Sequence, residues 1–141
     1  MRRGFTLLEM IVVIIVLGIL ASFAIPQFIK ATEKAKVGEA LGILPAVEGS
    51  QVRYAMEHDG VLSGNCSNLD ITIPAPKYFN LTCASGNSTG TAGVASMQRK
   101  VPAGGYGTYS LCIRENGTVE CSGGNTNDCL NLGQNVNGTC Q

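Results

Sequence analysis

Glu9 is the residue whose position most needs a chemical explanation. It closes the segment Gly4-Phe5-Thr6-Leu7-Leu8-Glu9 and stands directly before residues 10–29, which carry no charge. A carboxylate in a bilayer costs roughly 2.5–3.5 kcal/mol at the centre of a helix and less near its end, so a compensating partner is expected. One candidate is local, because Thr6-x-x-Glu9 matches a capping box at the start of a helix.

Six cysteines form the second reactive set, and all lie in the second half of the chain. No two are closer than eight residues, and His58 is the only histidine. Zinc sites need closely spaced cysteine pairs or neighbouring histidines, so the pattern predicts disulfides formed in an oxidising compartment and no metal site. The cysteines are Cys66, Cys83, Cys112, Cys121, Cys129 and Cys140.

The cysteine pairing is predicted from one turn and from proximity along the chain. Asn116-Gly117 is a preferred pair for a two-residue type I′ hairpin. That register places Cys112 opposite Cys121, with Cα atoms about 4.5 Å apart and within disulfide range. It also places Ile113 opposite Glu120. The three predicted disulfides are Cys112–Cys121, Cys129–Cys140 and Cys66–Cys83.

Composition argues against several classes of function. Ten Lys plus Arg balance ten Asp plus Glu, and no basic run appears, so nothing points to a nucleic-acid partner. The sequence offers no Ser/His/Asp set, no glycine-rich phosphate loop and no carboxylate pair on a recognisable scaffold. We therefore expect neither an enzyme nor a bound cofactor.

The apolar stretch of residues 10–29 is long enough to cross a membrane. Twenty helical residues extend roughly 30 Å, the thickness of a bilayer core. Arg2 and Arg3 precede it, which predicts a cytoplasmic N-terminus and an external remainder, in agreement with the cysteines. A secretory signal peptide has similar features, and Ser22-Phe23-Ala24 offers small residues for its cleavage.

The residues that follow favour one continuous helix over a signal peptide. Apolar side chains recur at helical spacing, and charged ones are predicted to fill the opposite, solvated face. The result is a helix of about fifty residues, apolar all round in its first half and along one stripe in its second. The stripe is Val37, Leu41, Leu44, Val47 and Val52; the charged face is Glu33, Lys34, Lys36 and Glu39.

Two prolines interrupt this helical pattern. Pro26 predicts a bend or an opening near Ser22, and Pro45 predicts a second bend. The helix is expected to stop at His58-Asp59-Gly60. Beyond it, residues 77–83 and 105–114 alternate as strands do, with a polar loop over residues 85–93.

Residues 4–9, followed by the apolar stretch and Ala24-Ile25-Pro26, resemble the N-terminus of bacterial type IV pilins and related pseudopilins. The resemblance is strong over residues 4–30 and fades after residue 60. It implies an α+β fold in which a long N-terminal helix packs on a small antiparallel, disulfide-bonded sheet. The expected divisions are a leader (1–4), a membrane-spanning and filament-core helix (5–29), an amphipathic helix (30–57) and a disulfide-rich β head (58–141).

The same resemblance implies how the chain is processed and assembled. A prepilin peptidase is expected to cut between Gly4 and Phe5 and to N-methylate Phe5. The new amine is a cation, and the resemblance implies that Glu9 pairs with this amine on a neighbouring subunit. At 4 Å and an effective dielectric of about 20, such a pair gains about 4 kcal/mol before desolvation is subtracted. Residues from Gly18 to Pro26 are expected to lose helical structure in a filament.

Three functions remain open at this point. The first is the subunit of a type IV pilus, inserted in the inner membrane as a precursor and then polymerised with itself, by the assembly machinery, into an extracellular filament. The second is a pseudopilin of a type II secretion system. Major pseudopilins carry a calcium site, for which this chain offers only Glu115, Glu120 and Asp128, well spread in sequence. The third is a monomeric, membrane-anchored binding domain.

Overall fold

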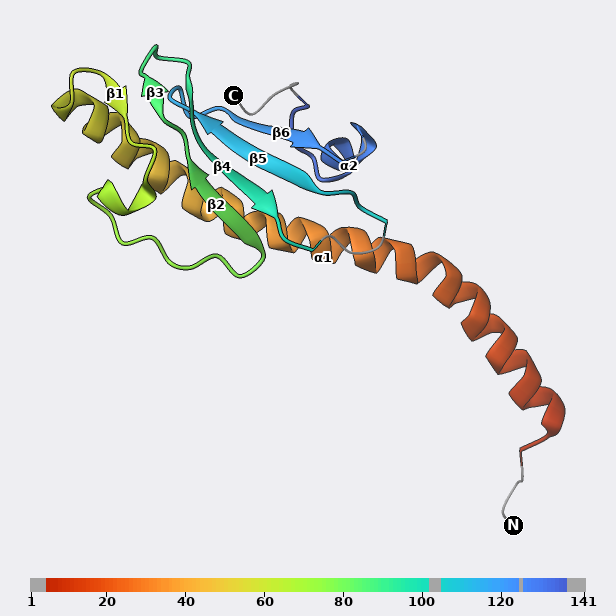
Figure 1. Cartoon of the computed structure of the whole chain (residues 1–141). Coiled ribbons are helices and arrows are strands. Elements are labelled where there is room, and N and C mark those ends of the chain that lie inside the picture. Colours follow the sequence, from red (N-terminus) through yellow and green to blue (C-terminus); the bar gives the residue numbers. More distant parts are fainter. Residues whose placement is uncertain (1–4, 102–104, 125, 137–141) are drawn as a thin grey trace.

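The long helix is the dominant element of the fold. A computed structural model describes residues 5–101, 105–124 and 126–136. Helix α1 (Leu7–Glu57) is unbroken over 51 residues, and its first half projects beyond the head (Figure 1). The helix ends where predicted. Asp59 and Gly60 adopt left-handed φ values of 52° and 79°, and the Gly60 N–H donates to the Ala55 carbonyl at 2.8 Å.

The head is a small antiparallel β structure, which confirms the predicted α+β fold. Its main sheet has four strands in the order β2-β4-β5-β6, all antiparallel. These are β2 (Phe79–Cys83), β4 (Gly93–Arg99), β5 (Tyr109–Arg114) and β6 (Val119–Gly123). Two-residue strands β1 (Val61–Leu62) and β3 (Gly86–Asn87) pair separately. Short helices η1 (Cys66–Asn68) and α2 (Thr126–Asn131) complete it.

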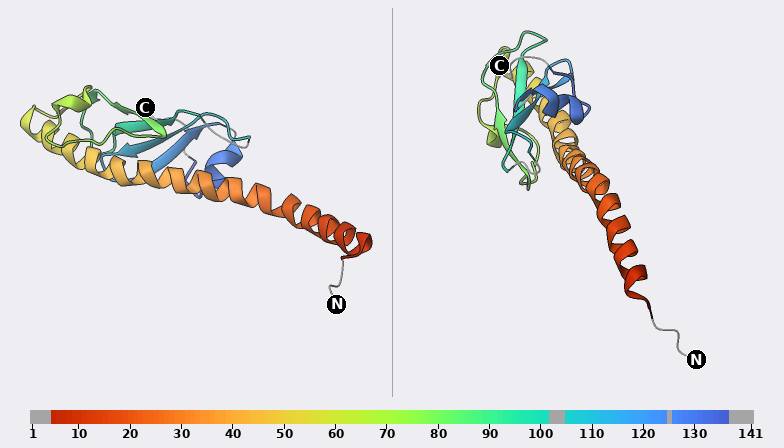
Figure 2. Two further views of the ribbon diagram at one scale, coloured as in Figure 1. Left: turned by 90° about the horizontal axis from the view of Figure 1, so that it is seen from below. Right: turned by 90° about the vertical axis from the view of Figure 1, so that its right-hand side faces the viewer.

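The core lies between the second half of α1 and the sheet, which the helix crosses on one side (Figure 2). The predicted apolar stripe is confirmed at Val37, Leu44 and Val47, which are at most 2% exposed. Each such side chain contributes roughly 1.5–3 kcal/mol when fully buried. The facing sheet residues include Phe79, Val94, Met97, Tyr109, Leu111 and Ile113.

Both predicted strands are present, but the strand between them was not predicted. Residues 77–83 contain β2, and the second half of 105–114 forms β5. Strand β4 lies between them in the sheet, with Val94 and Met97 fully buried. Its sequence, GVASMQR, has one β-branched residue, Val94, and no aromatic residue, so tertiary packing more than propensity forms it.

The predicted two-residue hairpin is wrong by one residue. Strand β5 pairs with β6 so that Ile113 faces Val119 and Leu111 faces Cys121. Both central residues of a type I′ turn need positive φ, and here only Gly117 has it (75°). The Gly117 N–H donates to the Arg114 carbonyl at 2.9 Å. The turn is therefore a three-residue loop that ends in a left-handed glycine.

This change of register overturns two of the predicted disulfides. Cys112 and Cys121 now point to opposite faces of the sheet, because a one-residue shift inverts the alternation of side chains. Cys121 bonds instead to Cys129, with Cα atoms 5.7 Å apart, so Cys129–Cys140 is wrong as well. Cys112 is disulfide-bonded. Cys140 lies outside the described residues. The third prediction, Cys66–Cys83, is confirmed, with Cα atoms 5.4 Å apart.

Candidate functional site: the apolar helix and its junction with the head

The first half of α1 exposes its apolar side chains on every side. Residues 5–28 are all exposed, although residues 10–29 carry no charge. Within the part of the chain that the structure describes, α1 is the one helix long and apolar enough to cross a membrane. Such a surface is far larger than a soluble monomer leaves in water, so it needs a bilayer or neighbouring helices around it.

Glu9 forms the capping box that the local alternative predicts. Its Oε2 accepts from the Thr6 N–H at 2.8 Å and from Thr6 Oγ1 at 2.7 Å. In return, the Glu9 N–H donates to Thr6 Oγ1 at 3.3 Å. These bonds satisfy two backbone groups at the start of α1 and place a negative charge at the positive end of the helix dipole. The local role is thus present in the single chain.

The predicted processing site adjoins this cap. Phe5 lies one residue before Thr6, and its side chain is 79% exposed. Gly4 lies outside the described residues. The cut between these residues, the methylation of Phe5 and the pairing of Glu9 with a neighbour therefore stay predictions.

Gly18 and Pro26 both lie inside the continuous helix. Nothing lies within 4 Å of a Cβ added at Gly18, so the absent side chain leaves open surface there. Pro26 has no N–H to offer the Ser22 carbonyl, while Ser22 Oγ donates to the Ile19 carbonyl at 2.6 Å. The helix curves in this half but does not open, and Pro45 does not interrupt it either (Figure 1).

Glu33 joins the apolar half to the head through a buried ion pair. Its carboxylate accepts two hydrogen bonds from Arg99 at the end of β4, both at 3.1 Å. Lys36 Nζ donates to it at 2.9 Å and Tyr109 Oη at 3.2 Å. The Glu33 and Arg99 side chains are 0% and 4% exposed. Burial alone raises the pKa of Glu33, but the bonds from Arg99 and Lys36 outweigh it and lower that pKa to about 2.

Glu33 was predicted on the solvated face, and that prediction is wrong. It lies four residues before Val37, and this spacing places it on the buried stripe. As an acidic residue it was assigned to the exposed face, because buried carboxylates are rare unless they are paired. Glu39 is also engaged: its two oxygens accept the N–H groups of Lys77 and Tyr78 at 2.7 and 2.9 Å. The Glu39 carboxylate therefore holds the two residues just before β2 against α1.

A second buried polar contact fixes the far end of the helix. The Gln51 amide donates to the carbonyl of Ser63 at 2.8 Å and to that of Val94 at 3.3 Å. Its oxygen accepts the Ser63 N–H at 2.9 Å. Sequence reasoning did not find Gln51, although it lies four residues after Val47 on the buried stripe. The two contacts hold α1 against the sheet at both ends of their interface.

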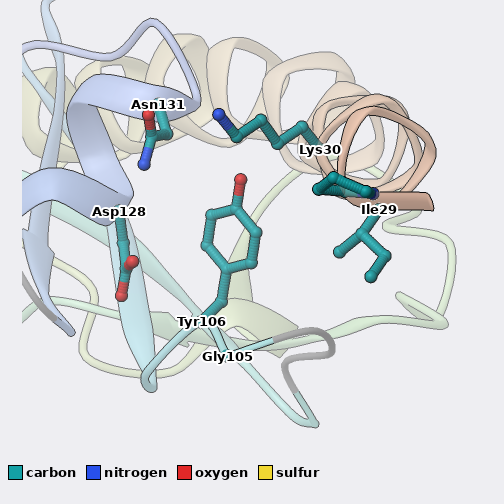
Figure 3. A pocket seen from close by; sticks show the side chains of 7 residues that line it. Ile29, Lys30, Gly105, Tyr106, Asp128 and Asn131 are labelled. Atoms are coloured by element: carbon teal, nitrogen blue, oxygen red, sulfur yellow. The ribbon is translucent and has the colours of Figure 1, made fainter. Parts of the chain in front are cut away.

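A cleft of about 230 Å³ opens where the apolar half meets the head. Pro26 and Ile29 form its apolar side, and residues from the β4–β5 connection and from α2 close the others. Figure 3 shows Lys30 and Tyr106 reaching into the space between α1 and α2, with Asn131 opposite. The sequence alone did not indicate this cleft.

The carboxylates considered for calcium have separate protein contacts. Glu115 accepts the N–H groups of Thr89 and Ala92 at 3.0 and 3.2 Å. Glu120 pairs with Arg114 at 3.0 Å. Asp128 accepts the Gly107 N–H at 2.9 Å. Among the described residues, no group of three or more histidines, cysteines and acids is placed to hold a metal ion.

Comparisons with known proteins identify the N-terminal segment. Residues 1–25 match the family model described as the prokaryotic N-terminal methylation motif. The type IV major pilin protein PilA of Myxococcus xanthus is 44% identical over 58 residues, 41% of this chain and 26% of the relative. The type II secretion system core protein G of Klebsiella pneumoniae is 42% identical over 57 residues, 40% of this chain and 41% of the relative.

A likeness that extends into the head is weaker. A fimbrial protein of Neisseria meningitidis serogroup B is 28% identical over 123 residues, 85% of this chain and 71% of the relative. The chain spans less than half the length of the Myxococcus and Klebsiella relatives. No solved structure matches it significantly. The chain thus carries the N-terminal methylation motif and is related to structural pilus and fimbrial proteins and to core protein G, none of which is named as an enzyme.

Proposed function

We propose that this relative of pilins and pseudopilins is the structural subunit of a type IV pilus. The precursor resides in the inner membrane through the first half of α1. A prepilin peptidase cuts it after Gly4 and methylates Phe5. The assembly machinery then draws mature subunits into a filament, in which the apolar halves bundle inside and the heads lie outside. Gly18 and Pro26 are the positions at which α1 adapts to that bundle.

The observation that carries this proposal is the division of α1 into two environments. Its second half is buried against a folded sheet, while residues 5–28 are exposed on every side. A membrane accounts for that exposure in the precursor, and a bundle of identical helices accounts for it in a filament. A monomeric anchored domain needs only the membrane, and the methylation motif then has no purpose.

The secretion pseudopilin is the second candidate, favoured by the 42% identity to core protein G. Two features of the head support the pilus instead. At least two disulfides, Cys66–Cys83 and Cys121–Cys129, staple a polar, loop-rich head, which suits a fibre exposed outside the cell. The second feature concerns the calcium site of major pseudopilins: Glu115, Glu120 and Asp128, the carboxylates considered for it, each bind a different backbone or side-chain group.

Surface shearing tests the choice. Cells that express the chain are sheared, and the released material is examined by negative-stain microscopy with an antibody against the head. Long, thin, labelled filaments are expected, and they should be absent from a strain in which the gene is deleted. Labelled protein confined to the membrane, together with loss of a secreted enzyme in the deletion strain, would instead establish the pseudopilin.

A further inference from the structure

The cleft between α1 and α2 is lined by hydrogen-bond donors and lies where the apolar stretch of α1 ends, at the expected level of the lipid headgroups. Pro26 and Ile29 belong to the last turn of the uncharged stretch, and Lys30 is the first charged residue after Glu9. A span that ends at residue 29 places the next turn of α1 among lipid headgroups, which occupy roughly 5–8 Å on each side of the hydrocarbon core. The cleft opens at that turn.

Tyr106 supplies a donor that has no acceptor within the described part of the chain. Its Oη atom is buried, and among the described residues it has no hydrogen-bond partner. A buried hydroxyl without a partner is costly, so it marks a place where another molecule is expected. Burial, with the charges of Asp128 and Glu33 adding to it, raises the pKa of Tyr106. The hydroxyl therefore stays protonated and able to donate at neutral pH.

Two further donors line the same space. In Figure 3 the Lys30 side chain extends over the Tyr106 hydroxyl toward the Asn131 side chain on α2. Asp128 is turned to the Gly107 N–H at 2.9 Å, and this bond holds the segment that carries Tyr106. An ammonium, a phenol and an amide that converge suit the oxygens of a phosphate, which accept hydrogen bonds and carry negative charge.

The surrounding charge favours the same ligand. All five lysines of the chain lie at this end of the head. Lys30 and Lys34 follow the apolar stretch directly. Lys36 and Lys77 lie 5.6 and 5.3 Å from the centre of the Tyr78 ring, and Lys100 Nζ bonds the Pro76 carbonyl at 2.7 Å. Together with Arg99 they outnumber the carboxylates of Glu33, Glu39 and Asp128 in the same region, so the net field attracts anions to the surface next to the membrane.

We propose that the cleft binds the phosphate of a membrane phospholipid while the subunit resides in the bilayer. The acyl chains then extend along Pro26 and the apolar half of α1. A second copy of α1 fits the cleft less well for two reasons. A helix with its side chains is about 10 Å wide, which is large for a cleft of about 230 Å³. An apolar helix also offers no acceptor to the donors of Lys30, Tyr106 and Asn131. The inference rests only on the membrane-resident stage of the proposed function, and polymerisation is not needed for it.

Native mass spectrometry of the full chain in detergent tests the proposal. Phosphatidylglycerol is compared with diacylglycerol of the same acyl chains and with glycerol 3-phosphate. Retention of one phosphatidylglycerol is expected, with at least a fivefold loss in Tyr106→Phe and in Lys30→Gln. Tyr78→Phe and Lys34→Gln make the same chemical changes outside the cleft and should stay within twofold of the parent. Unreduced peptide mapping confirms that each variant is folded.

Several results would overturn the inference. Equal retention of diacylglycerol would mean that the acyl chains bind the apolar surface and the phosphate contributes nothing. Equal binding of glycerol 3-phosphate would mean that the cleft recognises a free phosphate and needs no acyl chains. An equal loss in Lys34→Gln would indicate diffuse attraction by the lysines. A photo-crosslinker at Asn131 that captures a second copy of α1 in native membranes would assign the cleft to subunit contact. Alkaline extraction of membranes separately tests whether the chain is inserted, so a failure of the proposed function is distinguished from a failure of lipid binding.

Discussion

Glu33 on α1 and Arg99 at the end of β4 form a buried ion pair across 66 residues of sequence, with two nitrogen–oxygen distances of 3.1 Å. Loss of either side chain leaves the other as an unpaired buried charge. Glu33→Ala or Arg99→Ala should therefore destabilise the head by about 3–5 kcal/mol. The exposed pair Arg53–Asp70, with side chains 52% and 56% exposed, is the matched control. Arg53→Ala should change stability far less in the same chemical denaturation of the full chain in detergent, because exposed ion pairs contribute little.

The same carboxylate should make stability depend on acidity. Its pKa falls from an ordinary 4.5 to about 2 on folding, so the unfolded state binds a proton more readily than the folded state. The stabilisation is complete well above pH 4.5 and is lost as the pH falls through 4.5 toward 2, by roughly 3 kcal/mol in total. Denaturation midpoints measured across this range should show the fall, and Glu33→Gln should flatten it. An unchanged slope in that variant would assign the acid sensitivity to other groups.

Much of this architecture follows from the sequence, because the relevant signals are local. The apolar stretch, the stripe from Val37 to Leu44 and the stop at Asp59-Gly60 each depend on residues within a few turns of one another. Cys66–Cys83 was also found, by proximity alone. Sequence reasoning therefore predicts the helix, its two environments and its end.

The contacts that sequence reasoning missed are tertiary. Strand β4 has weak intrinsic preference and forms because β2 and β5 lie on either side of it. Glu33 resembles a solvated residue until Arg99 is brought opposite. In the β5–β6 turn, Asn116-Gly117 is compatible with a loop of two or of three residues. The loop length decides whether Cys112 and Cys121 lie on the same face of the sheet or on opposite faces. The cleft at Tyr106 needs three separate segments to meet, so no single stretch encodes it.

The corrected disulfides predict a specific peptide map. Unreduced digestion should release Cys121 linked to Cys129, and Cys66 linked to Cys83. Replacing Cys66 and Cys83 together with alanine should cost about 3 kcal/mol, since the closed loop is close to the 15-residue case. The shorter loop between Cys121 and Cys129 should contribute somewhat less. A recovered Cys112–Cys121 peptide would show that the two-residue turn forms after all.

Processing provides a prediction that needs only the intact mass. The mature chain should begin at Phe5 and carry one added methyl group. Gly4→Asp should block the cut, because the peptidase implied by the resemblance requires a residue without a side chain at that position. Gly18→Ala is the control, since an added Cβ there meets nothing within 4 Å. A mature chain that begins at Ile25 would restore the signal peptide and remove the basis of the pilin proposal.

Glu9 offers the sharpest test of assembly, because its cap and its charge can be separated. Thr6→Ala breaks the capping box but keeps the carboxylate, at a cost of about 1 kcal/mol of helix stability. Glu9→Gln keeps a side chain that can cap but removes the charge. If the carboxylate docks the Phe5 amine of a neighbour, Glu9→Gln should abolish or sharply reduce filaments while the membrane pool of mature subunit stays normal. Thr6→Ala should still assemble. Filament yield relative to that pool is the measurement, and normal filaments from Glu9→Gln would show that Glu9 acts as a cap alone.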